Sequence, residues 1–234
     1  MDEEFRFDLA IVPLSGGAFA VPTLLGNPQM KAEQLRDYEA GYRSQLNRRL
    51  SLDATAFGSY YRRLATKEPQ APFFTLSPGP PHLVFPIIFD NQAHAQNYGA
   101  ELFATWDVTG RWRISPGYSL LRMSITRDPS SRDSGIEQTT GDSPAHQFQG
   151  RSWFRLRNNL DWDNTLMYVS ALNHLAIPSY VRLDTRLGWR LGEFVEISIV
   201  GQNLLRARHV EFSDSQVRQT EVSRSVFGKV TWRF

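Results

Sequence analysis

The side chains best suited to chemistry in this sequence are its five histidines, which act in proteins as general bases and metal ligands. None has the paired spacing of a metal-binding helix such as H-E-x-x-H, and no G-x-S-x-G segment supplies a nucleophilic serine. The chain contains no cysteine, which excludes disulfides and thiolate sites. We therefore expect no enzymatic activity, no metal site and no cofactor; the histidines are His82, His94, His146, His174 and His209.

The charged residues are the second group of side chains that could take part in binding or catalysis. The 26 basic and 24 acidic side chains give a formal net charge of only +2, and the arginines are spread along the chain, so nucleic acid is not an expected partner. Many share one face of a predicted strand, where mutual neutralisation explains them. The alternative is a path for an anionic substrate. The residues concerned are Arg43, Arg155, Arg157, Arg182, Arg186 and Arg190 with Glu39, Glu101, Asp53 and Asp184.

These charges belong to a two-residue alternation, which is typical of β-strands because successive side chains point to opposite faces of a sheet. Between Tyr180 and Leu191, alternate positions are apolar and the others carry arginine or aspartate. Ser152–Trp162 and Arg36–Leu46 repeat the pattern. It predicts an all-β chain with nine strands, at 33–46, 50–66, 92–107, 111–127, 147–160, 163–172, 179–191, 194–203 and 221–234.

Two segments lack the alternation. Residues 1–32 are broken by prolines and by Gly16-Gly17, and they predict a loop-like segment with one strand remnant near Phe5–Ile11. The proline-rich stretch 67–91 is a second predicted loop, whose apolar residues 83–89 are expected to pack on one another. The chain is thus divided into residues 1–32 and a strand region, residues 33–234.

The lengths of strands and loops favour a transmembrane β-barrel over a soluble sheet, although both have one apolar face. Several strands run to about 14–17 residues, whereas soluble strands average roughly 5–6. Short turns also alternate with longer loops, as periplasmic turns and extracellular loops do in such barrels. The turns are 47–49, 108–110, 161–164 and 192–193; the loops are 67–91, 128–146, 173–178 and 204–220.

Tryptophan gives a third indication, because indole prefers the boundary between water and hydrocarbon. Five of the six tryptophans lie near a predicted short turn or the chain end, and only Trp153 does not. No run of 18 apolar residues predicts a transmembrane helix, and the first residues lack the features of a signal peptide. The five are Trp106, Trp112, Trp162, Trp189 and Trp232.

Three segments carry a resemblance to TonB-dependent receptors. Asn27–Lys31 followed by Tyr38–Arg43 resembles the loop-then-strand passage of this family, and Gly201–Leu205 with His209–Phe212 resembles the passage after the penultimate strand. Many members have an acidic residue where this chain has Arg206. The last strand resembles the signature by which outer-membrane barrels are recognised for assembly, through Val226, Val230, Trp232 and Phe234.

The resemblance implies a bacterial outer-membrane protein that imports a scarce ligand, most commonly a ferric siderophore, with energy relayed by the TonB complex through a plug domain. Its barrels have 22 strands, so the nine predicted here would form a partial barrel, residues 1–32 would be extracellular, and the plug would be missing. Outer-membrane lipid and the barrel-assembly machinery are the other implied partners. Because an open sheet leaves backbone groups unpaired in hydrocarbon, we expect the chain alone to aggregate or fail to insert.

Ligand contacts are expected in the extracellular loops, since loops carry binding on a rigid scaffold. Three alternatives stay open at this stage: a passive porin-like channel, an adhesive or structural outer-membrane barrel, and a soluble β-sandwich binding module. The loop residues expected to contact a ligand are Phe73, Phe74, His82, Arg132, Arg206, Arg208 and His209.

Overall fold

The computed structural model of the chain describes residues 6–15, 18–77, 79–213 and 221–234. The chain forms two compact units. The first unit consists of Met1–Asp37, Ser59–Asn97 and Met123–Thr140, and the second of Tyr38–Gly58, Tyr98–Arg122 and Gly141–Phe234. Long strands run through both units, so each unit is described by its own pairings.

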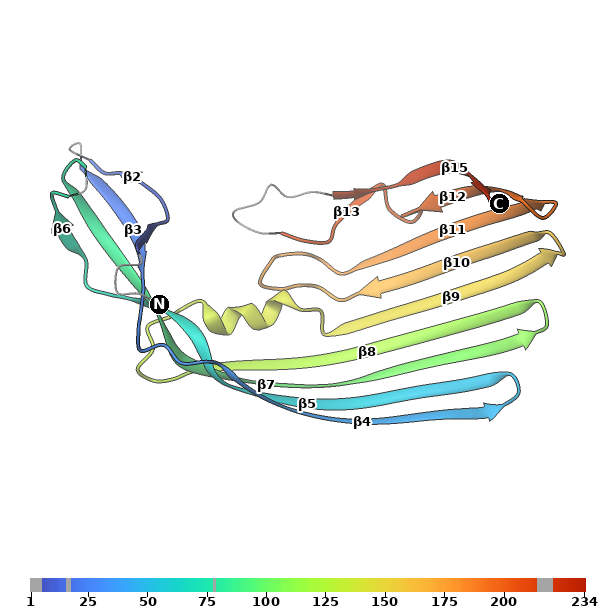
Figure 1. Cartoon of the computed structure of the whole chain (residues 1–234), viewed down its shortest axis with the longest axis horizontal. Helices are drawn as coiled ribbons and strands as arrows, with labels where there is room; N and C mark the ends of the chain where they lie inside the picture. The colour runs from blue at the N-terminus through green and yellow to red at the C-terminus, as the bar shows by residue number, and fades with distance from the viewer. Residues whose placement is uncertain (1–5, 16–17, 78, 214–220) are drawn as a thin grey trace. The chain divides into compact units, whose positions relative to one another are not determined.

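Nine long strands form one continuous ladder, as the alternation predicts (Figure 1). The pairings from β8 to β15 are all antiparallel. Among the described residues, β4 pairs only with β5 and β15 only with β12, so these two strands are the edges of the ladder. In order of pairing the strands are β4 (Gln34–Asn47), β5 (Leu50–Pro69), β7 (His82–Thr109), β8 (Trp112–Arg127), β9 (His146–Arg157), β10 (Leu160–Val169), β11 (Tyr180–Leu191), β12 (Val195–Gln202) and β15 (Ser225–Trp232).

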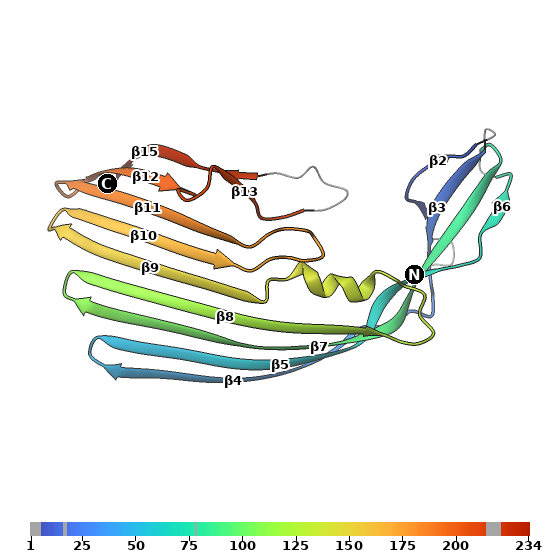
Figure 2. The ribbon, with the colours of Figure 1, turned by 180° about the vertical axis from the view of Figure 1, so that it is seen from behind.

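The hairpins β4–β5, β7–β8, β9–β10 and β11–β12 close through short turns, and longer connections join each hairpin to the next (Figure 2). This confirms the predicted alternation of turns and loops. The predicted turn at 161–164 is wrong, because the chain turns at Asn158-Asn159 and residues 161–164 lie in β10. Asp161 and Asp163 form ion pairs with Arg190 and Arg186 of β11, which extends the strand through this segment.

The ladder has one apolar and one charged face, as the alternation predicts. On β11, Leu187, Trp189 and Leu191 are 39–49% exposed, in rows with apolar residues of β10 and β12. The intervening residues Arg186 and Arg190 form ion pairs with carboxylates of β10. Burial therefore does not explain the apolar face, whereas contact with lipid would.

The first unit holds strands that the sequence did not predict. β3 (Phe19–Leu25) lies in the predicted loop 1–32 and pairs in parallel with the start of β7, and β6 (Phe73–Thr75) pairs with β7 on its other side. Two short strands, β1 (Arg6–Asp8) and β2 (Val12–Pro13), pair with β3, and β1 agrees with the predicted strand remnant. The apolar residues 83–89 thus lie within β7 and pack against β3, not only on one another.

The remaining elements lie in the long connections. The helix η1 (Ile136–Asp142) precedes β9, and the hairpin of β13 (Arg208–Val210) and β14 (Glu221–Ser223) lies between β12 and β15. The predicted strand 221–234 is therefore two strands, interrupted at Arg224. None of the helices in the described residues has the length and hydropathy needed to cross a membrane.

Candidate functional site

The charged face of the ladder contains a hollow of about 540 Å³ across strands β8 to β12, and Phe103 of β7 adds to its lining. Strand register places most of its lining in two neighbouring rows that point to the same face. One row runs Arg113, Trp153, Asp163, Arg186, Val200, and the other runs Ser115, Arg151, Thr165, Asp184. The hollow is therefore a product of pairing between five strands, not of any one segment of sequence.

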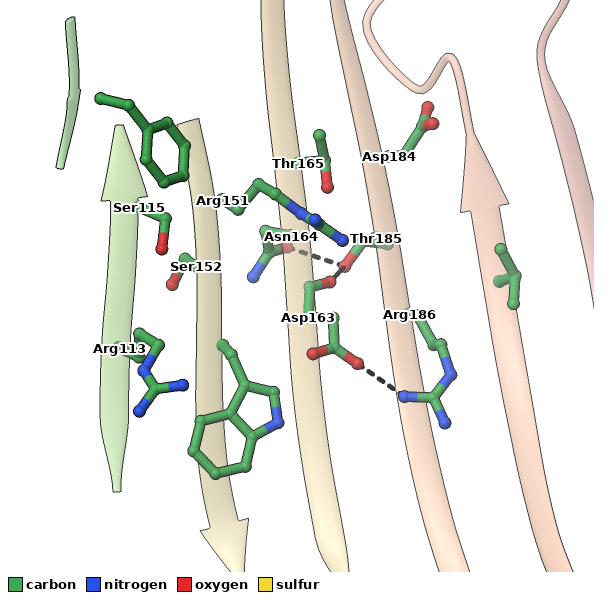
Figure 3. Close-up of a pocket in the computed structure, with 13 residues that line it drawn as sticks. Arg113, Ser115, Arg151, Ser152, Asp163, Asn164, Thr165, Asp184, Thr185 and Arg186 are labelled. Atoms are coloured by element: carbon green, nitrogen blue, oxygen red, sulfur yellow. Dashed lines mark hydrogen bonds and ion pairs between the residues drawn. The ribbon is translucent and has the colours of Figure 1, made fainter. Parts of the chain in front are cut away.

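Ion pairs fix most of the charges around this hollow (Figure 3). Arg186 donates to Asp163 at 2.6 Å and also pairs with Glu196 of β12. Arg113 donates to Asp107 at 2.6 Å. Each of these guanidinium groups thus has a fixed position, because its carboxylate partners lie on a paired strand or across a short turn.

Arg151 differs from the other two arginines of the hollow. Among the residues that the structure describes, no carboxylate lies within ion-pair distance of its guanidinium group. Figure 3 shows its side chain extending along the hollow toward Thr165. A cation without a protein partner is free to bind an anion from solution, so Arg151 is the group in the hollow best placed for that chemistry.

Trp153 gives the hollow an aromatic wall. It is the tryptophan that lies away from the turns, and its indole stands in the same row as Arg113. The guanidinium carbon of Arg155 lies 4.9 Å from the ring centroid, a cation–π distance that holds the indole in place. The site therefore combines a positioned aromatic surface with an arginine that forms no ion pair within the described ranges.

The sequence predicted only part of this site. Arg186 and Asp184 were expected on the charged face, and they line the hollow. The sequence did not predict a role on the charged face for Arg113, Arg151 or Trp153. For Arg151 a signal was present, because it has the same place in the alternation as Arg155. The placement of Arg157 on the charged face is wrong, because a β-bulge at Leu156 turns it to the apolar face.

The loop residues predicted as ligand contacts fall into two separate groups, one in each unit. In the first unit, Phe73 and Phe74 are exposed on β6, which pairs with β7 next to His82. His82 is not in a loop but is the first residue of β7, 6% exposed, with its Nδ1 2.9 Å from the Pro80 carbonyl oxygen. Arg132 donates its backbone N–H to the buried Glu68 carboxylate at 2.6 Å and leaves its side chain exposed.

A second group of predicted contacts surrounds β13. Arg206 is exposed, and Arg208 pairs with Glu221 across the hairpin at 3.2 Å. His209 is 6% exposed, stacks on Tyr180 with a 4.3 Å centroid distance, and contacts Glu211 through Nε2 at 2.9 Å. The histidine therefore anchors the hairpin to β11, while the two arginines present their side chains to solvent. Their part in ligand binding stays a prediction.

The residues of the predicted assembly signature share the apolar face at the end of the chain. Val226 and Val230 oppose Gly201 and Ile197 of β12, and both are about two-thirds exposed. Trp232 and Phe234 are exposed as well. Recognition of this strand during assembly stays a prediction.

Comparison with known proteins identifies the family that has this architecture. The family model for the β-barrel of TonB dependent receptor-like proteins matches residues 7–204. No curated protein matches the sequence.

Solved structures share the fold at low sequence identity. The ferric-catecholate import receptor Fiu from E. coli K12 superposes with a TM-score of 0.64 and 16% identity, over 87% of this chain and 28% of that one. The siderophore receptor PirA from Acinetobacter baumannii gives 0.67 and 14%, over 92% and 34%. The copper transporter OprC gives 0.63 and 12%, over 88% and 33%.

The chain therefore spans about a third of the length of the structures that it matches. Its fold is a part of a transmembrane antiparallel β-barrel, with nine ladder strands, and the family match extends over most of its residues. The chain belongs to the TonB-dependent receptor β-barrel family.

Proposed function

We propose that the chain forms part of the barrel wall and the extracellular loops of a receptor that imports a ferric siderophore across the bacterial outer membrane. The observation that carries this proposal is the hollow on the charged face. There Arg151, which has no carboxylate partner among the residues that the structure describes, lies beside the indole of Trp153. This face is the interior of the barrel. Import would involve no covalent chemistry.

The placement in the membrane follows from the two faces. The apolar face meets lipid, and tryptophans near the short turns lie at the membrane boundary. The short turns are then periplasmic, and the long connections and the sheet of β1, β2, β3, β6 and the start of β7 are extracellular. TonB-dependent receptor barrels are outer-membrane proteins, which supports the same localisation for this chain.

The partners follow from the family. A plug domain elsewhere in the receptor would close the barrel and contact the charged face, and the TonB complex would act on that plug. The barrel-assembly machinery would recognise the last strand through its apolar face.

The chemistry of the hollow favours an anionic chelate over a bare metal ion. Three arginines and two aspartates line it, and guanidinium groups bind oxyanions through paired hydrogen bonds. Arg113 and Arg186 are paired with carboxylates, so Arg151 is the arginine left for a ligand in the described part of the chain. Phe103 and Trp153 offer apolar surface for the organic part of such a ligand. In the described part of the chain, no three His, Asp or Glu side chains are grouped to hold a metal. Of the three relatives compared, one is named a ferric-catecholate import receptor, one a siderophore receptor and one a copper transporter, and the lining favours the first two classes of ligand.

The test is uptake of radioactive iron by cells that carry the gene for this chain or lack it. Iron-starved cells receive ferric complexes of catecholate and hydroxamate siderophores, and we expect uptake of one of them to depend on the gene. Arg151→Gln should lower that uptake about tenfold, by the loss of one charge-assisted hydrogen-bonding group. Arg48→Gln, in the β4–β5 turn, is the matched control and should leave uptake unchanged.

The same assay separates the rival functions. Uptake that persists after collapse of the proton-motive force would indicate a passive channel, because an energised receptor stops. Gene-dependent uptake of copper ions but of no ferric complex would overturn the siderophore assignment. Cells that lose surface attachment but no uptake would instead point to an adhesive barrel.

A further inference from the structure

The β-bulge in β9 places an arginine on the membrane face of the ladder. Leu160 of β10 opposes Arg157, whereas the next residue, Asp161, opposes Arg155, so Leu156 has no partner across the pair. Directly opposed residues in an antiparallel pair point to the same side. Arg157 therefore lies in the apolar row of Leu160, which continues to Trp189 and Ile197.

Next to Arg157 lies a shallow groove of about 430 Å³ on this apolar face. Its apolar walls come from Leu160, Leu187, Trp189, Ile197 and Ile199, and Arg157 stands at its end beside the Asn158-Asn159 turn. A second hollow of about 350 Å³ shares Leu187 and Ile199 with the groove and continues away from that turn. Together the groove and the second hollow form a continuous apolar depression on the surface, with the cation of Arg157 at one end.

The guanidinium group of Arg157 has no ion-pair partner in the described part of the chain. Among the described residues, no carboxylate lies within ion-pair distance of Arg157, and its side chain is exposed. An unpaired arginine is costly in contact with hydrocarbon and tolerated close to the boundary. Trp189 lies in the same row and is 49% exposed, and tryptophan side chains prefer the level of the lipid headgroups. Both features favour a position for Arg157 at the level of the lipid phosphates.

We propose that Arg157 and this groove bind one anionic phospholipid of the periplasmic leaflet. The guanidinium group receives the phosphate, since arginine binds phosphate oxygens through two parallel hydrogen bonds. One acyl chain lies along Leu187, Ile197 and Ile199 and continues into the second hollow. The occupant is a lipid and not a free phosphate, because the apolar depression that begins at the cation suits a chain attached to the anion.

The proposal is tested on the purified protein that carries this chain, loaded with phosphatidylglycerol and measured by native mass spectrometry. Wild type should keep one phosphatidylglycerol through detergent washes that remove bulk lipid. Arg157→Gln should lower the bound fraction about tenfold, as expected for loss of a charge-assisted hydrogen bond. Ile199→Trp, which fills the groove at an exposed position, should also lower it.

The matched control is Lys229→Gln, which removes one positive charge from the other face of the ladder. Lys229 opposes Ser198 of β12, one residue along from the apolar row. It should retain phosphatidylglycerol as wild type does. Arg157→Lys keeps the charge and should retain an intermediate amount, which distinguishes lost binding from a misfolded barrel.

Several results would overturn the proposal. One is that Arg157→Gln retains as much phosphatidylglycerol as wild type, or that Lys229→Gln loses as much as Arg157→Gln. Another is that wild type retains phosphatidylcholine as well as phosphatidylglycerol. The third is that inorganic phosphate displaces the bound lipid. The inference rests on the membrane placement in the proposed function but not on the imported ligand. Retained lipid without iron uptake would therefore contradict only the siderophore assignment.

Discussion

The carboxylate of Asp184 in β11 accepts a 2.9 Å hydrogen bond from the backbone N–H of Asn203, at the point where β12 ends. Asn203 is fully buried and has a φ of 51°, and its side-chain amide donates to the Val222 carbonyl oxygen at 2.9 Å. Asparagine tolerates this left-handed conformation better than most residues. One residue thus connects β11, the end of β12 and β14.

Replacement of Asn203 should destabilise this end of the barrel. Asn203→Ala removes the hydrogen bond to the Val222 carbonyl and strains the backbone, with an expected cost of about 2–4 kcal/mol. Urea unfolding in detergent, followed by tryptophan fluorescence, measures it. Asn203→Gly relieves the backbone strain and loses only the amide contact, so it should cost less. Equal stability of Asn203→Ala and wild type would contradict this account.

Arg186 should be the most important ion-pair residue of the charged face. It pairs with Asp163 and Glu196 from the two strands beside β11, with 31% of its side chain exposed. Arg186→Gln leaves two carboxylates unpaired and should cost about 1–3 kcal/mol. The control is Arg43→Gln, which breaks the pair with Asp53 at a position 83% exposed and should cost about 0–1 kcal/mol. Equal unfolding midpoints for the two variants would argue against the role given to Arg186.

The sequence predicted the strands of the ladder because most of them have one apolar and one polar face and therefore alternate in polarity, as β11 does. It failed where the ladder departs from simple alternation. The bulge at Leu156 reversed the face of Arg157, and no local pattern marks such an insertion. The parallel pair of β3 and β7 was missed because it joins segments about 60 residues apart, and because prolines such as Pro22 and Pro86, which are atypical of strands, lie within both strands.

The candidate site was only partly predictable for a related reason. Alternation identifies which face a side chain occupies, but the hollow depends on register between five strands. That register determines that Arg113 of β8 lies beside Trp153 and that, among the described residues, carboxylates reach Arg186 but not Arg151. The buried positions of His82 and His209 also depend on tertiary pairing with β3 and stacking on Tyr180.

A pH dependence is expected in the first unit, outside the membrane-crossing strands. The Thr23 hydroxyl donates to Asp8 at 2.7 Å, and this bond, followed by that from Arg6, lowers the pKa of the Asp8 carboxyl below its ordinary value. A lowered pKa means that the carboxylate stabilises the fold above the ordinary value of about 4, and that this contribution is lost as pH falls through the lowered pKa.

Thr23→Val tests this dependence, since Thr23 is fully buried and valine has a similar shape. The variant should melt at a lower temperature than wild type at pH 6, and the difference should shrink at pH 3. Thr23→Ser keeps the hydroxyl and should follow wild type at both values. A difference that is independent of pH would attribute the effect to packing instead of to the Asp8 carboxylate.

On the membrane face, the indole N–H groups of Trp112 and Trp162 are satisfied within the protein. Trp162 donates to the Thr185 hydroxyl oxygen at 2.9 Å, and that hydroxyl donates to the Asn164 side-chain oxygen at 2.8 Å. Trp112 donates to the Ser152 hydroxyl oxygen in the same way, at 3.1 Å. Where lipid replaces water, no solvent molecule can substitute for such an acceptor.

Thr185→Val should therefore cost about 1–3 kcal/mol, because it leaves the Trp162 N–H and the Asn164 oxygen without their partner. The measurement is urea unfolding in lipid vesicles, with Thr185→Ser as the control that restores the hydroxyl. In detergent micelles, where water reaches the boundary more easily, the same substitution should cost less. If Thr185→Val unfolds at the same urea concentration as Thr185→Ser in vesicles, water or lipid headgroups accept the hydrogen bond of the Trp162 indole. The Thr185 hydroxyl then has no stabilising role.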